Sequence, residues 1–389
     1  MIMLKAYLLR NLPEKLCYRL NRCVRSVSVT HKKCDQTFRP YSTRPIAPAW
    51  NVLFFGTDDF SAESLTALCN EMKLLRVVGH LEVVTSTKSR KPNPVQRIAQ
   101  QENLAVHPWP LESVPPGFHI GLVASFGHLI PKKIIEMFPL GVLNVHASLL
   151  PRWRGAAPIV YAVLNGDTKT GVSIMQIMPH RFDVGPVLKQ MACPIGPHET
   201  AADVQTRLAR LGAEALLEVV RHLPHSLDDA WPQLEDGVTY APKVTPALYR
   251  ADWHKMAAAD VYNLCRALGH VTSNWYGTAV RLAQPDAPSS APSPVSHLSS
   301  LPATAIPGGD VASSRTPRRA LSTESFTGQQ FTPGMVRIHR ASAMLRVMCV
   351  DGSWLAFAKV TIIGKKPMSA IDFYNGFLSK VPLDEWILT

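Results

Sequence analysis

Two polar side chains lie two residues apart at the end of an apolar run, within the segment L-N-V-H-A-S-L-L-P-R-W-R-G-A-A-P at 143–158. Because side chains alternate across a β-strand, Asn144 and His146 would point to one face and could reach one reacting atom. The carboxyl end of a buried parallel strand is also where open α/β sheets bind their substrates. The pair is therefore a candidate site, although an Asn-x-His pair by itself is more often a capping or surface feature.

A carboxylate is the third candidate for chemistry. Asp183 lies in M-P-H-R-F-D-V-G-P-V-L at 178–188, shortly after the apolar run Val172–Ile177. Taken alone this residue is typical of a tight turn, because Asp tolerates the turn geometry and its side chain bonds nearby backbone.

Several motifs together resemble one known family, the folate-dependent formyltransferases. They are the two segments above and F-F-G-T-D-D-F at 54–60, N-G-D-T-K-T-G-V-S-I-M-Q at 165–176 and G-K-K-P-M-S-A-I-D-F-Y-N-G at 364–376. The resemblance covers the chain from Trp50 to the C-terminus. It implies that 10-formyltetrahydrofolate donates a formyl group to the amino group of methionyl-tRNA for the initiation of mitochondrial translation, and that Asn144, His146 and Asp183 form the catalytic set.

The chemistry of formyl transfer suits these three residue types. The reaction passes through a tetrahedral intermediate, so N–H donors such as the Asn144 amide and the His146 ring must point at the developing negative oxygen. An α-amino group titrates at roughly 7.7–8.0, so a strong base is unnecessary. We expect Asp183 to relay protons through a water and to orient or charge His146. The alternative is that Asp183 only braces its turn, which predicts nearly intact turnover for Asp183→Asn.

The resemblance also implies which residues bind the folate. The backbone of Ser148, Leu149, Leu150 and Pro151 would line its pocket, and the segment 122–131 would form a wall against the pterin through Phe126, Leu129 and Ile130. The same residues could equally be plain loop packing. The reaction requires no metal ligands or phosphate-binding glycines, and we expect no metal.

Binding of the tRNA acceptor stem and CCA end is implied for several basic residues. The loop Thr85–Pro94 would enter the acceptor stem with Lys88, Arg90 and Lys91. Contacts to phosphates would position the tRNA there, whereas contacts to base edges would read its sequence. Arg152, Trp153 and Arg154 would place the CCA end by charge and stacking. The barrel side would contribute Lys243, Lys359, Lys365 and Lys366. Without the resemblance, such a charge run indicates a solvated surface.

The N-terminal residues differ in composition from the rest of the 389-residue chain. Ten of the first 45 residues are Lys or Arg and two are acidic, which accounts for +8 of the net charge of +12. An Arg-rich, acid-poor leader is typical of a mitochondrial transit peptide, so we predict residues 1–45 to direct the protein to the matrix. The alternative is a basic tail that binds RNA. No apolar run approaches the roughly 20 residues that cross a bilayer, so we expect no membrane association. We also expect the protein to be a monomer.

The length allows two domains. Apolar runs predict strands at 51–55, 82–85, 120–124, 142–145 and 172–177, with helices between them, as in a doubly wound α/β domain with a mostly parallel sheet. Thr200 and Asp203 predict the start of a helix with one apolar face. We therefore predict a catalytic domain of the formyltransferase type at 50–222, followed by a Pro-rich linker at 223–250.

The remaining residues, 251–389, are predicted to form a small tRNA-binding domain. Asp252 is expected to cap a helix that ends at Gly269. Short strands at 335–338, 345–350 and 355–362 predict a β-barrel, which the resemblance makes OB-like. A Pro/Ser/Ala tract at 284–332 has too little apolar periodicity to fold and is expected to be a disordered insertion. Cys69, Cys193, Cys265 and Cys349 lack the spacing of a zinc site or a disulfide framework.

Two other functions compete with the predicted one. A formyltransferase of the same family could act on a different amine, such as a glycinamide ribonucleotide or an amino sugar. A protein of another class, which keeps a catalytically dead transferase fold and binds RNA, would also explain the basic leader and the barrel.

Overall fold

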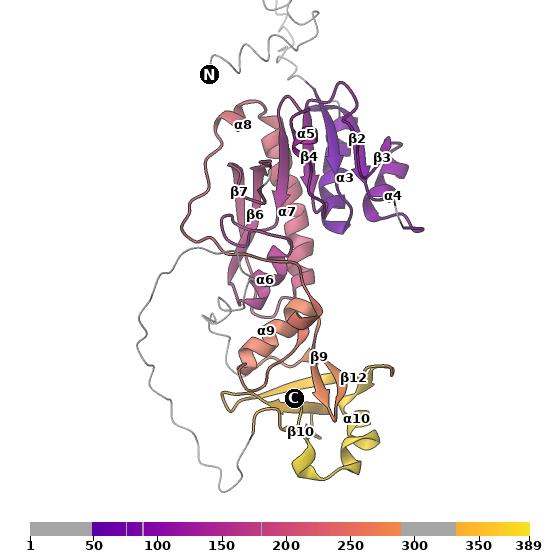
Figure 1. The fold of residues 1–389 in the computed structure, drawn as a ribbon, viewed down its shortest axis with the longest axis vertical. Coiled ribbons are helices and arrows are strands. Elements are labelled where there is room, and N and C mark those ends of the chain that lie inside the picture. Colours follow the sequence, from indigo (N-terminus) through magenta and orange to yellow (C-terminus); the bar gives the residue numbers. More distant parts are fainter. Residues whose placement is uncertain (1–48, 75, 88, 180, 289–331) are drawn as a thin grey trace, which may run out of the picture.

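The structure, a computed structural model, describes residues 49–74, 76–87, 89–179, 181–288 and 332–389. The predicted transit peptide at 1–45, Lys88 and all but the ends of the predicted insertion lie outside the described residues. The described residues form an α/β unit and a smaller β unit, with one helix between them, and the molecule is elongated (Figure 1).

A seven-stranded sheet forms the α/β unit, in the order β3-β2-β1-β4-β5-β6-β7. Its strands are β1 Trp50–Phe55, β2 Val78–Thr85, β3 Val106–Pro108, β4 Ile120–Ala124, β5 Val142–His146, β6 Lys169–Gln176 and β7 Val187–Pro194. The first five are parallel, whereas β6 runs antiparallel to both β5 and β7. The predicted mostly parallel α/β sheet is therefore confirmed. Because β1 pairs with both β2 and β4, the strand order reverses there, which in such sheets opens a crevice for ligands.

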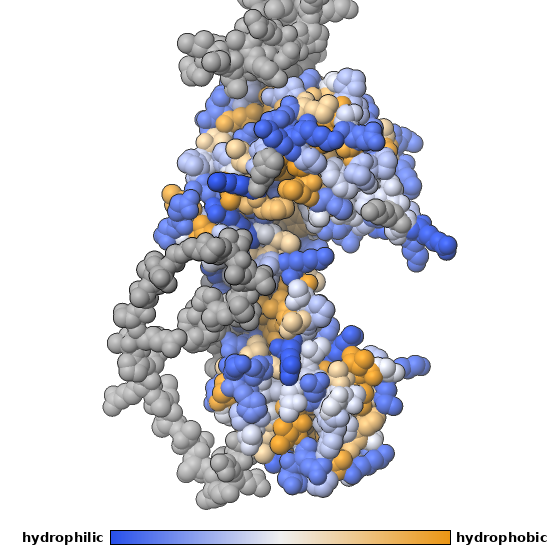
Figure 2. Space-filling view, viewed as in Figure 1, coloured by the Kyte–Doolittle hydropathy of each residue, from blue (hydrophilic) through white to orange (hydrophobic). Residues whose placement is uncertain are grey.

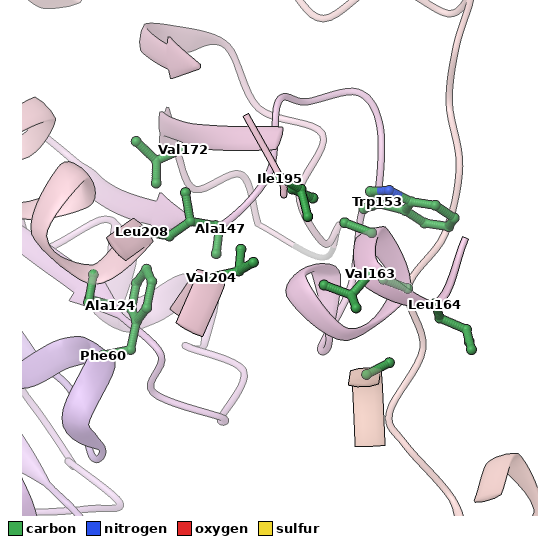
Figure 3. Packing of buried hydrophobic residues seen from close by; sticks show 14 of the residues in the cluster. Phe60, Ala124, Ala147, Trp153, Val163, Leu164, Val172, Ile195, Val204 and Leu208 are labelled. Carbon is green, nitrogen blue, oxygen red and sulfur yellow. The ribbon is translucent and has the colours of Figure 1, made fainter. Parts of the chain in front are cut away.

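Helices cover this sheet, and three of them begin at a capping box. They are α3 Asp59–Lys73, α4 Pro94–Gln101, α5 Lys132–Ile135, α6 Pro158–Leu164 and α7 Ala201–Arg221. Thr200 and Asp203 form the predicted capping box of α7. The apolar face of α7 is buried in the main core, where Val204 and Leu208 join Phe60 and Val172 (Figure 3). Gly212 allows a close approach to β5, since a Cβ there would lie 2.7 Å from a methyl group of Val145.

The β unit is an antiparallel sheet in the order β10-β11-β12-β9-β8, with β13 beside β12. Its elements are β8 His270–Trp275, β9 Thr278–Pro285, β10 Val336–His339, β11 Met344–Met348, β12 Trp354–Ile362, β13 Met368–Ser369 and α10 Ala370–Gly376. The predicted insertion starts too early, because Gln284 and Pro285 still belong to β9 and Pro285 pairs with Phe357.

The C-terminal residues join the two edges of this β sheet. The backbone N–H of Val336, at the β10 edge, donates to Trp386 O at 2.7 Å, and that of Leu388 donates to Gly334 O at 2.8 Å. At the β8 edge, Asn274 and Thr389 exchange two backbone hydrogen bonds of 2.7 and 2.9 Å. The sheet therefore closes on itself through residues 386–389, as a small β-barrel requires.

The helix α9, Ala258–Leu268, lies between the two units (Figure 1). The prediction that Asp252 caps it is wrong. The helix begins six residues later, after Ala257, and the Ala257 N–H donates the capping hydrogen bond to the Asp260 carboxylate at 3.0 Å. Asp252 instead starts a separate turn that includes Lys255. Gly269 ends the helix with φ +83°, as predicted.

A buried arginine on α9 ties the units together. Arg266 is 6% exposed and donates to the Glu199 backbone oxygen at 2.8 Å and to Asn263 Oδ1 at 2.9 Å. Beside it, the Arg207 guanidinium binds the Glu199 carboxylate through both of its oxygens and, with the Gly196 N–H, lowers the pKa of Glu199 to about 2. One apolar core runs through both units. The β unit is therefore held in a defined position relative to the sheet.

The predicted linker, 223–250, is tied to the α/β unit along much of its length. It contains the short helices α8 His225–Asp228 and η1 Pro246–Tyr249. Trp231 exchanges backbone hydrogen bonds with Val187, and the backbone of 239–241 pairs with that of 154–157. The latter pairing places the linker beside the loop that follows β5.

No helix of the described residues has the length and apolar character needed to cross a bilayer. Among the same residues, no three His, Cys, Asp or Glu side chains lie close enough to hold a metal ion. Cys69, Cys265 and Cys349 are buried thiols, and burial raises the pKa of each to about 11, 12 and 12 respectively.

Candidate active site

A cavity of about 680 Å³ opens at the carboxyl ends of β4 and β5. The structure brings the three candidate residues Asn144, His146 and Asp183 together in its wall. The other lining residues come from the strands β4, β5 and β6, the start of α3, the loop 125–130, the segment 155–160 before and within α6, the turn between β6 and β7, α7 and the linker. The cavity lies next to the β1–β4 switch point, where ligands of such sheets bind.

Asn144 presents a free amide to this cavity. The residue lies in the middle of β5, pairs with Met175 of β6, and is only half-buried because its side chain faces the cavity. Its side-chain amide makes no hydrogen bond to any described residue. A donor without a protein partner is available to a bound ligand, in contrast to the general rule that such groups are paired.

His146 ends β5 and is held by the backbone that follows it. Its ring is 5% exposed, and Nε2 lies 2.9 Å from Trp153 O. A carbonyl oxygen only accepts, so Nε2 must carry a hydrogen. The other nitrogen, Nδ1, lies 3.7 Å from Asp183 Oδ1, which is ion-pair distance and too long for a hydrogen bond.

Asp183 occupies a turn that fixes the direction of its carboxylate. Its backbone has φ +52°, a left-handed conformation that Asp tolerates better than most residues. Oδ2 accepts a hydrogen bond of 2.8 Å from the Gly155 N–H, which leaves Oδ1 facing His146. Gly155 is required there, since its φ is +124° and a Cβ would lie 2.5 Å from Ala241 O. The Asn144 amide and the His146 ring can stabilise a developing oxyanion. The Asp183 carboxylate, which the Gly155 N–H holds in place beside Nδ1, can accept and return a proton.

The loop after β4 forms an apolar wall of the cavity, and it contains the predicted Phe126, Leu129 and Ile130. Phe126 is buried and meets Phe55 and Trp109 edge to face, at centroid distances of 5.5 and 5.0 Å. Leu129 is 52% exposed at the cavity. The loop is tied to the end of β1, because Thr57 Oγ1 donates to Ser125 O and Ser125 Oγ donates to the Asp58 carboxylate.

The predicted folate contacts Ser148, Leu149, Leu150 and Pro151 do not line the cavity. Ser148 Oγ donates to Arg152 O at 2.6 Å, and Leu150 packs against Met175 and Val187. The side chains of Ser148 and Leu150 therefore support the loop 148–154 from within, and contact between the backbone of this segment and the folate stays a prediction.

The basic residues predicted to bind tRNA separate into two groups. Arg154 is 8% exposed and donates two hydrogen bonds, of 3.0 and 2.8 Å, to Gln233 Oε1, so it is not free to bind phosphate. Arg152 forms a bidentate pair with Asp167 at 2.9 and 2.6 Å and lies 4.5 Å above the Trp153 ring. The others are exposed: Arg90, Lys91, Lys365 and Lys366, together with Lys243 and Lys359.

Several cavity residues were not predicted. Asp58, Phe60 and Gln205 line it from α3 and α7, and Arg181 and Phe182 line it beside Asp183. Lys243, expected on the barrel side, also lies at the cavity. Arg181 and Phe182 share the motif that singled out Asp183, which was the available signal. No local signal distinguishes Gln205 from the other polar residues of a surface helix.

Sequence comparison relates the chain to known proteins. Residues 52–220 match the family described as formyl transferase. The mitochondrial methionyl-tRNA formyltransferase of Homo sapiens is 40% identical over 338 residues, which cover 85% of this chain and 78% of the human protein. A methionyl-tRNA formyltransferase of Roseobacter denitrificans is 34% identical over 335 residues, covering 84% of this chain and 95% of that protein.

Solved structures share the fold. WlaRD, a sugar 3N-formyl transferase, superposes with a TM-score of 0.52 at 14% identity, over 82% of this chain and 99% of that one. HypX from Aquifex aeolicus, solved in complex with tetrahydrofolic acid, superposes with a TM-score of 0.51 at 16% identity, over 85% of this chain and 48% of that one.

Proposed function

Because this chain belongs to the formyl transferase family, we propose that its cavity brings 10-formyltetrahydrofolate and the amino group of methionyl-tRNA together. The activity is transfer of the formyl group to methionyl-tRNA, which yields formylmethionyl-tRNA for translation initiation. The observation that carries the proposed site is the convergence of Asn144, His146 and Asp183 on one cavity.

The cavity suits a folate donor in size and lining. Small-molecule sites measure roughly 300–1,000 Å³ and combine apolar walls with a few polar groups, and this cavity measures about 680 Å³. Phe126, Leu129 and Ile130 supply an apolar wall against which the pterin ring would pack. The bound folate supplies the formyl group, and the residues of this chain act on its carbonyl oxygen and on the protons.

Asn144 and His146 would stabilise the negative oxygen that forms when the amine attacks the formyl carbon. The Asn144 amide is free to donate because it is bonded to none of the described residues. Since the Nε2 hydrogen of His146 is already bonded to Trp153 O, only Nδ1 can donate to the substrate. The Asp183 carboxylate stands 3.7 Å from Nδ1, close enough to attract a positive charge that develops on the ring during the reaction. Removing one oxyanion donor typically costs about 10²- to 10³-fold in kcat.

Asp183 would handle the proton that leaves the attacking amine. The Gly155 N–H occupies Oδ2, so Oδ1 is the oxygen that can accept, directly or through a water. The same proton is needed on the folate nitrogen as it leaves, which His146 or the water can return. No strong base is required, since an α-amino group is substantially neutral near pH 8.

The exposed basic residues would bind the tRNA. Arg90 and Lys91 lie in the loop between β2 and α4, which projects from the surface with a hydrophilic tip (Figure 2), and we propose that it contacts the acceptor stem. Arg181 and Lys243 line the cavity and would contact phosphates of the CCA end, while Lys365 and Lys366 would hold the tRNA at the β unit. Such contacts predict an affinity that falls steeply with salt.

The relatives with which the chain shares 40% identity are mitochondrial forms, which places this protein in mitochondria. We propose the matrix as its compartment, since translation initiation takes place there and residues 1–45 have the composition of a transit peptide. We further propose that the protein acts as a monomer, because one chain supplies all three residues of the site.

An assay with labelled 10-formyltetrahydrofolate tests this function. Methionyl-tRNA should become formylated, whereas uncharged tRNA, free methionine and an amino-sugar nucleotide should not. His146→Ala should lower kcat by about 10²-fold or more, and His222→Ala, at an exposed histidine at the end of α7, should not. Formylation of the sugar instead of the tRNA would assign another acceptor, and no transfer to any amine would indicate a catalytically dead fold.

A further inference from the structure

A glutamine of the linker contacts both loops that carry the active site. Gln233 Oε1 accepts two hydrogen bonds from Arg154, of 3.0 Å from Nε and 2.8 Å from Nη2. Its Nε2 donates to Asp183 O at 2.8 Å and to Gly185 O at 2.9 Å. All hydrogen-bonding positions of the amide are thereby used, so the side chain has one defined orientation.

The orientation of this amide follows from its partners. A guanidinium only donates and backbone carbonyls only accept, so the oxygen of Gln233 must face Arg154 and the nitrogen must face the turn. The two carbonyls belong to the start and the end of the turn 183–185. Gln233 therefore bridges the loop after β5 to the turn that sets the direction of the Asp183 carboxylate.

The turn depends on external contacts for its shape. Asp183 has a left-handed backbone, a conformation that persists in a non-glycine residue where the surroundings hold it. Gly185 packs so closely on β6 that a Cβ would lie 1.8 Å from Gln176 O. Apart from Gln233, the polar contact between the turn and the 153–157 loop is the one from Gly155 N–H to Asp183 Oδ2.

We propose that Gln233 is a positioning residue for formyl transfer, which holds the Asp183 carboxylate at the distance from His146 that the reaction needs. The inference rests on the function proposed above. The linker 223–250 would then take part in catalysis, because Gln233, the side chain that fixes the turn, belongs to the linker and not to the sheet. Misplacing a catalytic group by about 1 Å can cost 10²-fold in rate.

The variant Gln233→Glu separates this role from general stability. A carboxylate keeps an oxygen for Arg154, but its second oxygen would face the carbonyls of Asp183 and Gly185 and repel them. We expect kcat to fall about 10- to 100-fold, with KM for both substrates changed less than about twofold. Asn51→Ala is the matched control, since it also removes an amide that donates to a backbone carbonyl, Gly117 O at 2.8 Å, but at the opposite end of β1. This control should keep its kcat.

A double-mutant cycle shows whether Gln233 acts through Asp183. If it does, Gln233→Glu should have little further effect in an Asp183→Asn background. Additive losses, or a folded Gln233→Glu protein with kcat within twofold of wild type, would overturn the inference. Should Gln233→Glu fail to fold, Gln233→Met keeps the length of the side chain without the repulsion and enters the same cycle.

Hydrogen exchange tests the geometry without the reaction. The Gly155 amide, which donates to Asp183, should exchange faster in Gln233→Glu and Gln233→Met than in wild type or Asn51→Ala, and equal rates would contradict the inference. A wild-type protein without formyl transfer would refute the proposed function instead, and the exchange rates would still decide whether Gln233 holds the turn.

Discussion

The charge of Asp183 can be separated from its role in the turn by Asp183→Asn. Asn also tolerates a left-handed backbone, and its side-chain oxygen can keep the hydrogen bond from the Gly155 N–H. The substitution therefore removes the negative charge near His146 and the proposed acceptor of the amine proton, and leaves the turn in place. The two explanations of this residue, proton handling and turn bracing, predict different rates.

The size of the effect follows from the distance between the charges. Nδ1 of His146 lies 3.7 Å from Asp183 Oδ1. At this separation two unit charges interact by about 1 kcal/mol in water and about 4.5 kcal/mol at an effective dielectric constant of 20. Both side chains are largely buried, with 5% and 15% exposure, so the higher value is the better guide. Since about 1.4 kcal/mol is tenfold in rate, we expect a loss of roughly 10²- to 10³-fold in kcat.

The assay is single-turnover formyl transfer from 10-formyltetrahydrofolate to methionyl-tRNA, with the thermal midpoint of each protein measured alongside. The midpoint of Asp183→Asn should stay within about 3 °C of wild type, because its hydrogen bonds remain. A kcat within about threefold of wild type would refute proton handling and charge pairing by Asp183, and would leave turn bracing as its role.

Three further predictions concern Gly155, Glu199 and Leu388. Gly155→Ala should lower kcat at least tenfold and cost about 1–3 kcal/mol of stability, measured by turnover and urea unfolding, because its backbone is left-handed and a Cβ would collide with Ala241 O. Glu199→Gln should destabilise the protein by about 1 kcal/mol at pH 7. Because the folded pKa of Glu199 is lowered to about 2, this difference should shrink as the pH falls below the ordinary value of 4.5, and a difference that is constant from pH 7 to pH 3 would contradict the ion pair with Arg207. Leu388→Ala should cost about 3 kcal/mol in denaturant unfolding, because the residue is 1% exposed where the β sheet closes, and a change below about 1 kcal/mol would show that the closure contributes little.

Features that depend on neighbouring residues could be predicted from the sequence. The period of two in L-N-V-H was enough to place Asn144 and His146 on one face of a strand, and Thr200 with Asp203 was enough to start α7. The strands β11 and β12 followed from their apolar runs, and Gly269 was enough to end α9. The start of α9 was mispredicted because Asp252 and Asp260 are both suitable capping residues, and the local sequence does not decide between them.

Features that depend on distant contacts could not be predicted in this way. Arg154 belongs to an R-W-R motif that indicates surface charge, yet it is buried because Gln233, 79 residues later, supplies its partner. A buried guanidinium without such a partner would be too costly. The hydrogen bond from Ser148 Oγ to Arg152 O within the loop was likewise not predicted, because the local sequence does not indicate how the loop turns back on itself.

The attachment of residues 231–241 to the loops of the proposed active site decides where the chain can be divided. A fragment that stops after α7 would keep every strand of the large sheet. It would lose Gln233, which is the partner of Arg154, and the backbone of 239–241 that pairs with 154–157. That backbone includes Ala241 O, the atom that leaves no room for a Cβ at Gly155. Anyone who wishes to exchange the β unit for that of a relative should therefore make the junction beyond Lys243.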